Sequence, residues 1–142
     1  DLYHQQTGEY PTIVGGPWWV ASNVAFYGRQ PASVFADLDE SISPWATDRN
    51  LSEHGGVIVW TKSSDDSEFE DSITRRFPNA QLTESLELAS QTSATLAPVR
   101  FGVAIVLPEN HVTAMKVDRV KATTLDMASL QKPAMPSDSK RR

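Results

Sequence analysis

The fourteen residues from Val14 to Tyr27, VGGPWWVASNVAFY, restrict the fold more than any other segment. A short apolar run ends in two glycines. Pro17 follows where its fixed φ angle and missing N–H suit the first turn of a helix, and Gly28 marks the end of that helix. The segment therefore predicts a strand, a tight turn and a helix that packs on a sheet. Its apolar positions at helical spacing are Val20, Val24 and Tyr27, with Ala21 and Ala25 beside them.

Two further short strands are predicted before the middle of the chain. Ser33 to Asp37 forms the first, and Ser43 or Asp48 is placed to cap a short helix that ends at Gly55. The run from Val57 to Trp60 is continuous, apolar and too short for a helix. Such a run is typical of a central strand that is buried on both faces of a parallel sheet.

A longer amphipathic pattern begins at Ser67. Ser67 and Glu70 have the spacing of a capping box, which predicts a helix start. Phe69, Ile73 and Phe77 recur every four residues and fall on one face of that helix. This face is expected to cover the sheet.

The last two predicted strands, Leu82 to Leu88 and Val99 to Leu107, follow each other with no helix between them. They are therefore expected to be antiparallel neighbours. The element order β-α-β-α-β-α-β-β predicts an α/β fold, a layered sandwich whose mostly parallel sheet ends in an antiparallel C-terminal strand pair.

Charge divides the chain into a body and a tail. Residues 1–110 carry 6 Lys and Arg against 15 Asp and Glu, whereas residues 111–142 carry 7 against 3. An acidic body repels phosphate backbones, so no nucleic-acid partner is expected. The tail has few large apolar residues and is predicted to be disordered. Its last basic residues are either solvated or in weak contact with anionic lipid headgroups.

Other features bear on the class of protein. The chain has 142 residues, begins at Asp1 in the style of an excised fragment, and contains no run of about 18 apolar residues that would span a membrane. It has no cysteine, which excludes disulfides, thiolate metal sites and a Cys nucleophile. His4, His54 and His111 are not at metal-ligand spacing, so no metal or cofactor is predicted.

Candidate binding residues gather where the predicted parallel strands end. Gly15 and Gly16 stand before a helix and either cradle a phosphate or simply form a tight turn. Asp37, Asp39 and Glu40 follow a strand and either hold a divalent cation, accept hydrogen bonds from sugar hydroxyls, or form an acidic surface loop. Because ligands of α/β folds bind at this edge, we expect a crevice there. The candidate ligand-binding residues are Gly15, Gly16, Trp18, Asp37, Asp39 and Lys62.

Four tryptophans are numerous for this length, and an indole face stacks well on a sugar ring. Trp60 lies in an apolar strand and is expected in the core. Trp18 and Trp19 are adjacent on a helix, so at most one of them is fully inward. An outward tryptophan beside the glycine turn is the preferred candidate for stacking on a glycan.

Three blocks together resemble a known family: VGGPWWVASNVAFY, SVFADLDESISPW (Ser33 to Trp45) and LSEHGGVIVW (Leu51 to Trp60). In order and spacing they are similar to the soluble C-terminal domain of bacterial integral-membrane glycosyltransferases. The group is that of the protein mannosyltransferase and aminoarabinose transferase-like enzymes, which use polyprenyl-phosphate sugars. The resemblance covers approximately residues 2–108 and is weak beyond Gln81.

The resemblance implies a domain on the periplasmic side of the inner membrane. Its partners would be the membrane-embedded part of the same polypeptide and an acceptor glycan, lipid or protein. The family's catalytic acidic residue lies in an external loop that this chain does not contain, so no catalytic residue is assigned and the fragment itself is expected to be inactive. The alternative is a free-standing ligand- or partner-binding α/β module.

The charge division yields a first prediction. Because residues 113–142 lack a buried periodic pattern, deleting them should leave the melting temperature within about 2 °C of the full chain in thermal unfolding followed by circular dichroism. A clear loss of stability would mean that the tail docks on the body.

Overall fold

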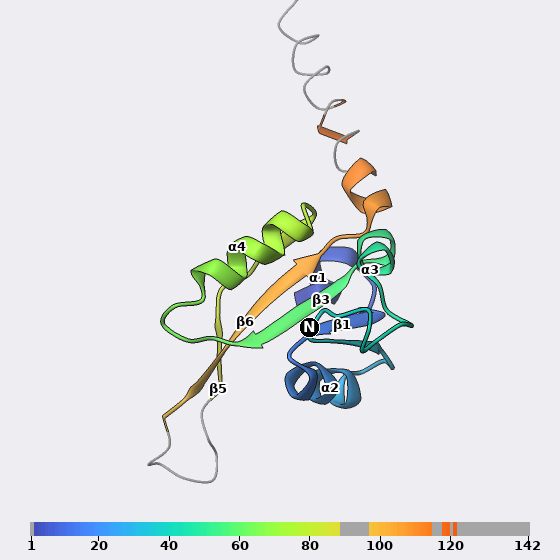
Figure 1. The fold of residues 1–142 in the computed structure, drawn as a ribbon. Coiled ribbons are helices and arrows are strands. Elements are labelled where there is room, and N and C mark those ends of the chain that lie inside the picture. The colour runs from blue at the N-terminus through green and yellow to red at the C-terminus, as the bar shows by residue number, and fades with distance from the viewer. Residues whose placement is uncertain (1, 89–96, 115–117, 120, 122–142) are drawn as a thin grey trace, which may run out of the picture. The chain divides into compact units, whose positions relative to one another are not determined.

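The computed structural model describes residues 2–88, 97–114, 118, 119 and 121 (Figure 1). Asp1–Val112 form one compact unit and Thr113–Arg142 form a second. Val112, the last residue of the first unit, packs against the apolar cluster of the body. Most of the tail lies outside the described residues. The disorder and the lipid contact that the sequence predicts for the tail therefore stay predictions.

One mixed sheet organises the compact unit, with the strand order β2-β1-β3-β6-β4 and with β5 also paired to β6. β1 pairs in parallel with β2 and β3, whereas β6 runs antiparallel to β3, β4 and β5. The predicted α/β class, with parallel strands first and antiparallel pairing at the end, is confirmed. The strands are β1 (Ile13–Gly16), β2 (Ser33–Ala36), β3 (Gly56–Thr61), β4 (Ala80–Leu82), β5 (Leu86–Leu88) and β6 (Val99–Val106).

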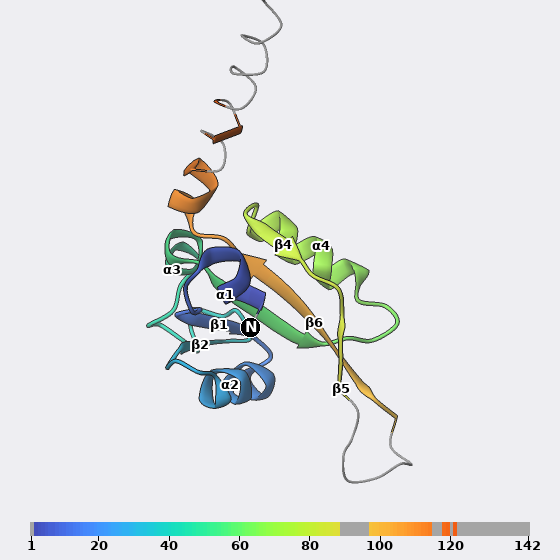
Figure 2. The same cartoon turned by 180° about the vertical axis from the view of Figure 1, so that it is seen from behind.

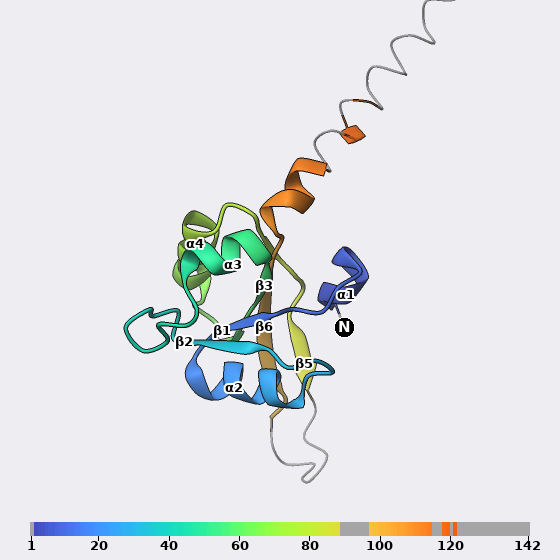
Figure 3. The ribbon, with the colours of Figure 1, turned by 90° about the vertical axis from the view of Figure 1, so that its right-hand side faces the viewer.

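Helices lie on both faces of this sheet (Figures 1 and 3). α3 and α4 cover one face, and α1 and α2 lie on the other, which Figure 2 shows from the α1 side. None of the described helices is long and apolar enough to cross a bilayer. Their bounds are α1 (Leu2–Thr7), α2 (Trp18–Tyr27), α3 (Asp48–His54) and α4 (Ser67–Arg76).

The central strand β3 is buried on both faces, as its continuous apolar run predicts. Ile58 and Trp60 point toward the α3 and α4 side, whereas Val57 and Val59 point toward the α1 and α2 side. All four side chains are buried. Each contributes about 1.5–3 kcal/mol through burial, so both layers are needed to stabilise the strand.

The predicted inner face of α4 is confirmed. Ile73 and Phe77 are buried and Phe69 packs against the same core cluster. The helix start differs from the predicted capping box. Glu70 does not turn back to Ser67 but pairs with Lys62, at 3.0 Å between Oε1 and Nζ.

The cap of α3 also differs from the expected residues. Thr47 is the N-cap, and its Oγ1 accepts a hydrogen bond from the Asn50 N–H at 3.1 Å. Ser43 is instead fully buried, and its Oγ accepts from the Ala36 N–H at 3.0 Å. The Ser43 hydroxyl therefore satisfies a backbone donor at the end of β2, which leaves the cap to Thr47.

The face that α2 buries is rotated from the predicted one. Val20, Ala21 and Ala25 are buried against the sheet, whereas Val24 and Tyr27 are exposed. The small alanine side chains allow the helix to approach the sheet closely, and this turns the larger side chains away. Two more features are not predicted by the sequence pattern. One is the N-terminal helix α1, and the other is the break in the predicted strand Leu82 to Leu88, where β4 ends at Leu82 and β5 begins at Leu86.

The two glycines at the end of β1 have separate packing roles. A Cβ on Gly15 would lie 2.6 Å from Cδ2 of Leu38, so the glycine makes room for that buried side chain. Gly16 has a φ of 127°, and a Cβ there would collide with the carbonyl oxygen of Val59 in β3. Both glycines therefore keep the parallel strands and the following loop in close contact.

The collision at Gly16 yields a second prediction. Gly16→Ala should lower the free energy of unfolding by at least about 3 kcal/mol, because it combines a disfavoured φ with a backbone clash. Gly8 has a φ of 75° with no atom near its missing Cβ, so Gly8→Ala is the matched control and should cost about 1 kcal/mol. Denaturant titration measures both, and equal losses would contradict the packing role of Gly16.

Candidate functional site

The carboxyl edge of the parallel strands brings together most of the candidate residues predicted from the sequence. β1 ends at Gly16, and the Asp37 N–H donates to the carbonyl oxygen of Gly16 at 2.8 Å. The Asp37 carboxylate accepts from the Trp18 N–H at 3.2 Å, at the first residue of α2. Gly16, Trp18 and Asp37 are therefore neighbours at this edge, with Trp18 exposed and the two glycines, Gly15 and Gly16, buried.

An internal anion already occupies the start of α2. Free N–H groups and the helix dipole favour negative charge at such a terminus. Here the Asp37 carboxylate takes that position, and Pro17 supplies no donor. The geometry therefore favours the tight-turn interpretation of Gly15 and Gly16 over a phosphate cradle.

The other acidic residues of this loop also have donors within the protein. Asp39 Oδ1 accepts from the Ser41 N–H at 2.8 Å and from the Ser41 hydroxyl at 2.6 Å. These bonds hold the pKa of the Asp39 carboxyl below its ordinary value. Glu40 accepts from the Asp48 N–H at 3.0 Å. Within the described ranges, no group of three His or acidic side chains is placed to hold a metal ion.

The loop that follows β2 is held in an unusual backbone conformation. Asp37 and Leu38 both have a φ of 53°, in the left-handed region that leucine rarely adopts. Arg76 donates to the Leu38 carbonyl oxygen at 2.7 Å and binds both carboxylate oxygens of Asp48. Its guanidinium also lies 5.9 Å from the ring centroid of Phe35. Arg76 therefore ties this loop to α3 and α4.

Lys62 lies apart from the other predicted residues. It follows β3, its N–H donates to the Arg100 carbonyl oxygen at 2.7 Å, and its ammonium pairs with Glu70 on α4. No contact in the described part of the chain joins Lys62 to Trp18 or Asp37. The structure thus brings five of the six candidates to one region and leaves the sixth on the α4 side of the sheet.

Three of the four tryptophans are exposed. Trp18 and Trp19 start α2, with exposed fractions of 62% and 48%. Trp45 lies in the loop after β2, and its indole N–H donates to the Val34 carbonyl oxygen at 3.1 Å. Trp60 is buried, as expected for its strand. Trp18 therefore offers an exposed indole beside the Asp37 turn.

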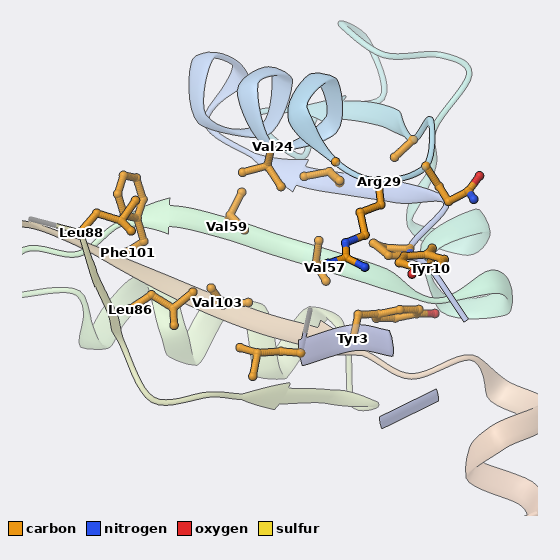
Figure 4. Close-up of a pocket in the computed structure, with 16 residues that line it drawn as sticks. Tyr3, Tyr10, Val24, Arg29, Val57, Val59, Leu86, Leu88, Phe101 and Val103 are labelled. Atoms are coloured by element: carbon orange, nitrogen blue, oxygen red, sulfur yellow. The ribbon is translucent and has the colours of Figure 1, made fainter. Parts of the chain in front are cut away.

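A groove of about 480 Å³ lies elsewhere, on the α1 and α2 face of the sheet (Figure 4). Val57, Val59 and Val103 form its floor, and Val24 of α2 and Leu86 of β5 stand at its sides. It contains none of the six predicted site residues. Its polar end includes Pro11 and Gln30, which precede β1 and β2, so this end is at the amino edge of the parallel strands.

The two ends of this groove differ in chemistry. Leu86, Leu88 and Phe101 surround one end, whereas Tyr3, Tyr10 and Arg29 gather at the other (Figure 4). Burial raises the pKa of the Tyr3 hydroxyl, Glu9 adds to the effect, and the hydroxyl donates to the His54 carbonyl oxygen at 3.5 Å. Tyr10 stacks on His4 with ring centroids 4.5 Å apart.

Sequence reasoning missed this groove because its lining comes from segments far apart in the chain. Its residues come from α1, the turn after α2, β3, β5 and β6, and they form one surface only after folding.

Comparison with known proteins found no matching family model, curated protein or solved structure.

The hydrogen bonds of Asp39 yield a third prediction. Ser41→Ala removes the hydroxyl donor, so the pKa of Asp39 should rise toward its ordinary value in a carboxyl NMR titration. The pKa of Asp39 is lower in the folded state than in the unfolded state. Ionised Asp39 therefore stabilises the fold at pH values above its unfolded-state pKa, and this stabilisation is lost as the pH falls through its folded-state pKa. Ser72→Ala, which removes a hydroxyl on α4, is the control and should leave Asp39 unchanged. An unchanged Asp39 titration in Ser41→Ala would contradict this origin of the shift.

Proposed function

We propose that this chain is a non-catalytic domain of a membrane glycosyltransferase that transfers a sugar from a polyprenyl-phosphate donor. In this proposal the domain lies on the periplasmic side, packs against the membrane-embedded part of the same polypeptide, and helps to hold the acceptor or stabilises the enzyme. The resemblance of the three sequence blocks supports the family. The surface of α2 supports the docking role.

The single observation that carries the proposal is the composition of α2. This ten-residue helix contains no charged side chain, yet much of it faces solvent. Phe26 and Tyr27 are 80% and 79% exposed, and Trp18 and Trp19 are also exposed. The rings of Phe26 and Tyr27 lie edge to face with centroids 5.0 Å apart, and clustered exposed apolar side chains of this kind mark an interaction surface.

The residue types on α2 suit a position near a membrane. Trp and Tyr combine an apolar ring with a polar group and are enriched at the membrane–water interface. The docking face of the domain would therefore consist of Trp19, Phe26 and Tyr27. The membrane-embedded part of the polypeptide and the adjoining interface would cover it.

The acceptor would bind at the carboxyl edge of the parallel strands. There Trp18 presents an indole suited to stacking on a sugar ring, next to the Asp37 turn. The loop that carries this turn is anchored by Arg76, so the edge is preorganised for a ligand.

A free-standing ligand-binding module is the second candidate function, and the apolar groove favours it. The two candidates differ in what precedes Asp1 in the gene. Several apolar segments of membrane-spanning length would support the transferase, and a start codon directly before Asp1 would support the module.

A fourth prediction tests the docking role in the full-length parent protein. Phe26→Ser combined with Tyr27→Ser should reduce sugar transfer at least about tenfold, because polar side chains weaken docking of the domain. Leu82→Ser is the matched control: Leu82 is 44% exposed and lies on β4, outside both α2 and the loop after β2, so its replacement should leave transfer near the wild-type rate.

Two further measurements in the same assay separate the roles. Trp18→Ala should raise KM for the acceptor more than it lowers kcat, as expected for lost binding. The purified fragment should show no turnover above a boiled control. Wild-type transfer in the Phe26/Tyr27 variant, or turnover by the fragment, would overturn the proposal.

A further inference from the structure

The α1 and α2 face of the sheet is incompletely covered by the described helices. α2 packs over β1 and β2 through Val20 and Ala25, and α1 contributes Tyr3. Between them the groove of about 480 Å³ remains open over β3 and β6 (Figure 4). This volume lies within the range of about 300–1,000 Å³ that small-molecule sites occupy.

A cation lies at the polar end of this groove. Arg29 extends from the turn after α2 into the groove, between Tyr10 and Val57 (Figure 4). Among the described residues the structure gives Arg29 no ion pair, although the body of the protein is rich in carboxylates. A guanidinium above an apolar floor favours an anionic group at this end.

We infer that the groove binds a long-chain carboxylate. The aliphatic chain lies over Val57, Val59 and Val103 and reaches Leu86 and Leu88. The carboxylate pairs with the Arg29 guanidinium, whose planar fork matches it, and Tyr3 and Tyr10 line the same end. The Tyr3 hydroxyl is directed to the His54 carbonyl oxygen, so Arg29 is the group that holds the carboxylate. The site is separate from the strand edge that carries Trp18 and does not depend on the proposed transferase role.

Charge favours a long-chain carboxylate over a phosphate monoester and over the tail of the same chain. A phosphate monoester carries about two negative charges at neutral pH, whereas Arg29 is the one Lys or Arg in the described lining of the groove. A single negative charge therefore matches the groove better. The chain's own tail is basic, with 7 Lys and Arg against 3 Asp and Glu in residues 111–142, so Arg29 repels it.

Calorimetric titration of the full chain with dodecanoate, below its micelle concentration, tests the inference. We expect 1:1 binding that weakens about tenfold in Arg29→Gln. Dodecyl phosphate and dodecyltrimethylammonium should both bind more weakly than dodecanoate. Leu88→Asp should also weaken binding, because Leu88 is 61% exposed and its replacement places a charge in the groove without disturbing the core.

Matched controls keep the result specific. Arg75→Gln removes an exposed arginine on α4, and Ile42→Asp places a charge on an exposed site outside the groove. Both variants should bind dodecanoate as the wild type does. Circular dichroism and melting temperature establish that Arg29→Gln and Leu88→Asp remain folded.

Several results would overturn the inference. Absent binding, equal affinity in Arg29→Gln, or a preference for dodecyl phosphate would each exclude a carboxylate on Arg29. Binding that appears only after residues 113–142 are deleted would make the tail the native occupant. A dimer in light scattering that Leu88→Asp dissociates would make a second copy the occupant. All of these are measured on the isolated chain, so a failure here is distinct from a failure of the transferase proposal, which is tested by sugar transfer in the parent protein.

Discussion

The burial of β3 on both faces is the constraint on which the rest of the structure depends. Its side chains alternate, with Ile58 and Trp60 on one side and Val57 and Val59 on the other, so the sheet needs a layer on each face. α3 and α4 supply one layer through Leu51, Ile73 and Phe77. The other layer is lighter, since α1 has six residues and α2 contacts the sheet mainly through small side chains.

This difference between the layers links the fold to both proposed binding surfaces. Because Ala21 and Ala25 bring α2 close to β1 and β2, the larger aromatic side chains of that helix remain outside. The parts of β3 and β6 that α2 does not cover keep an apolar surface, which becomes the groove. The close packing of α2 on β1 and β2 thus leaves two apolar surfaces. One is the outer face of α2, and the other is the groove beside that helix.

The sequence predicts the elements whose signals are local. The glycine pair after Val14, the apolar run of β3 and the spacing of Ile73 and Phe77 are set by neighbours in the chain, and the structure confirms the elements that they predict. Features that depend on distant partners were missed. Thr47 replaced Ser43 as a cap because Ser43 bonds Ala36, and the anchoring role of Arg76 requires Asp48 from another helix.

The same reasoning explains the outcome at the candidate site. Because adjacent parallel strands end at the same edge, Gly16, Trp18 and Asp37 lie together. Lys62 instead forms an ion pair with Glu70 of α4 on the other face.

The central claim is that the lightly covered face of the sheet receives a ligand. Methyl NOEs from the chain of bound dodecanoate test it most directly. The account predicts NOEs to Val57 and Val59 and none to Ile58, while NOEs to Ile58 or only to exposed residues outside the groove would contradict it.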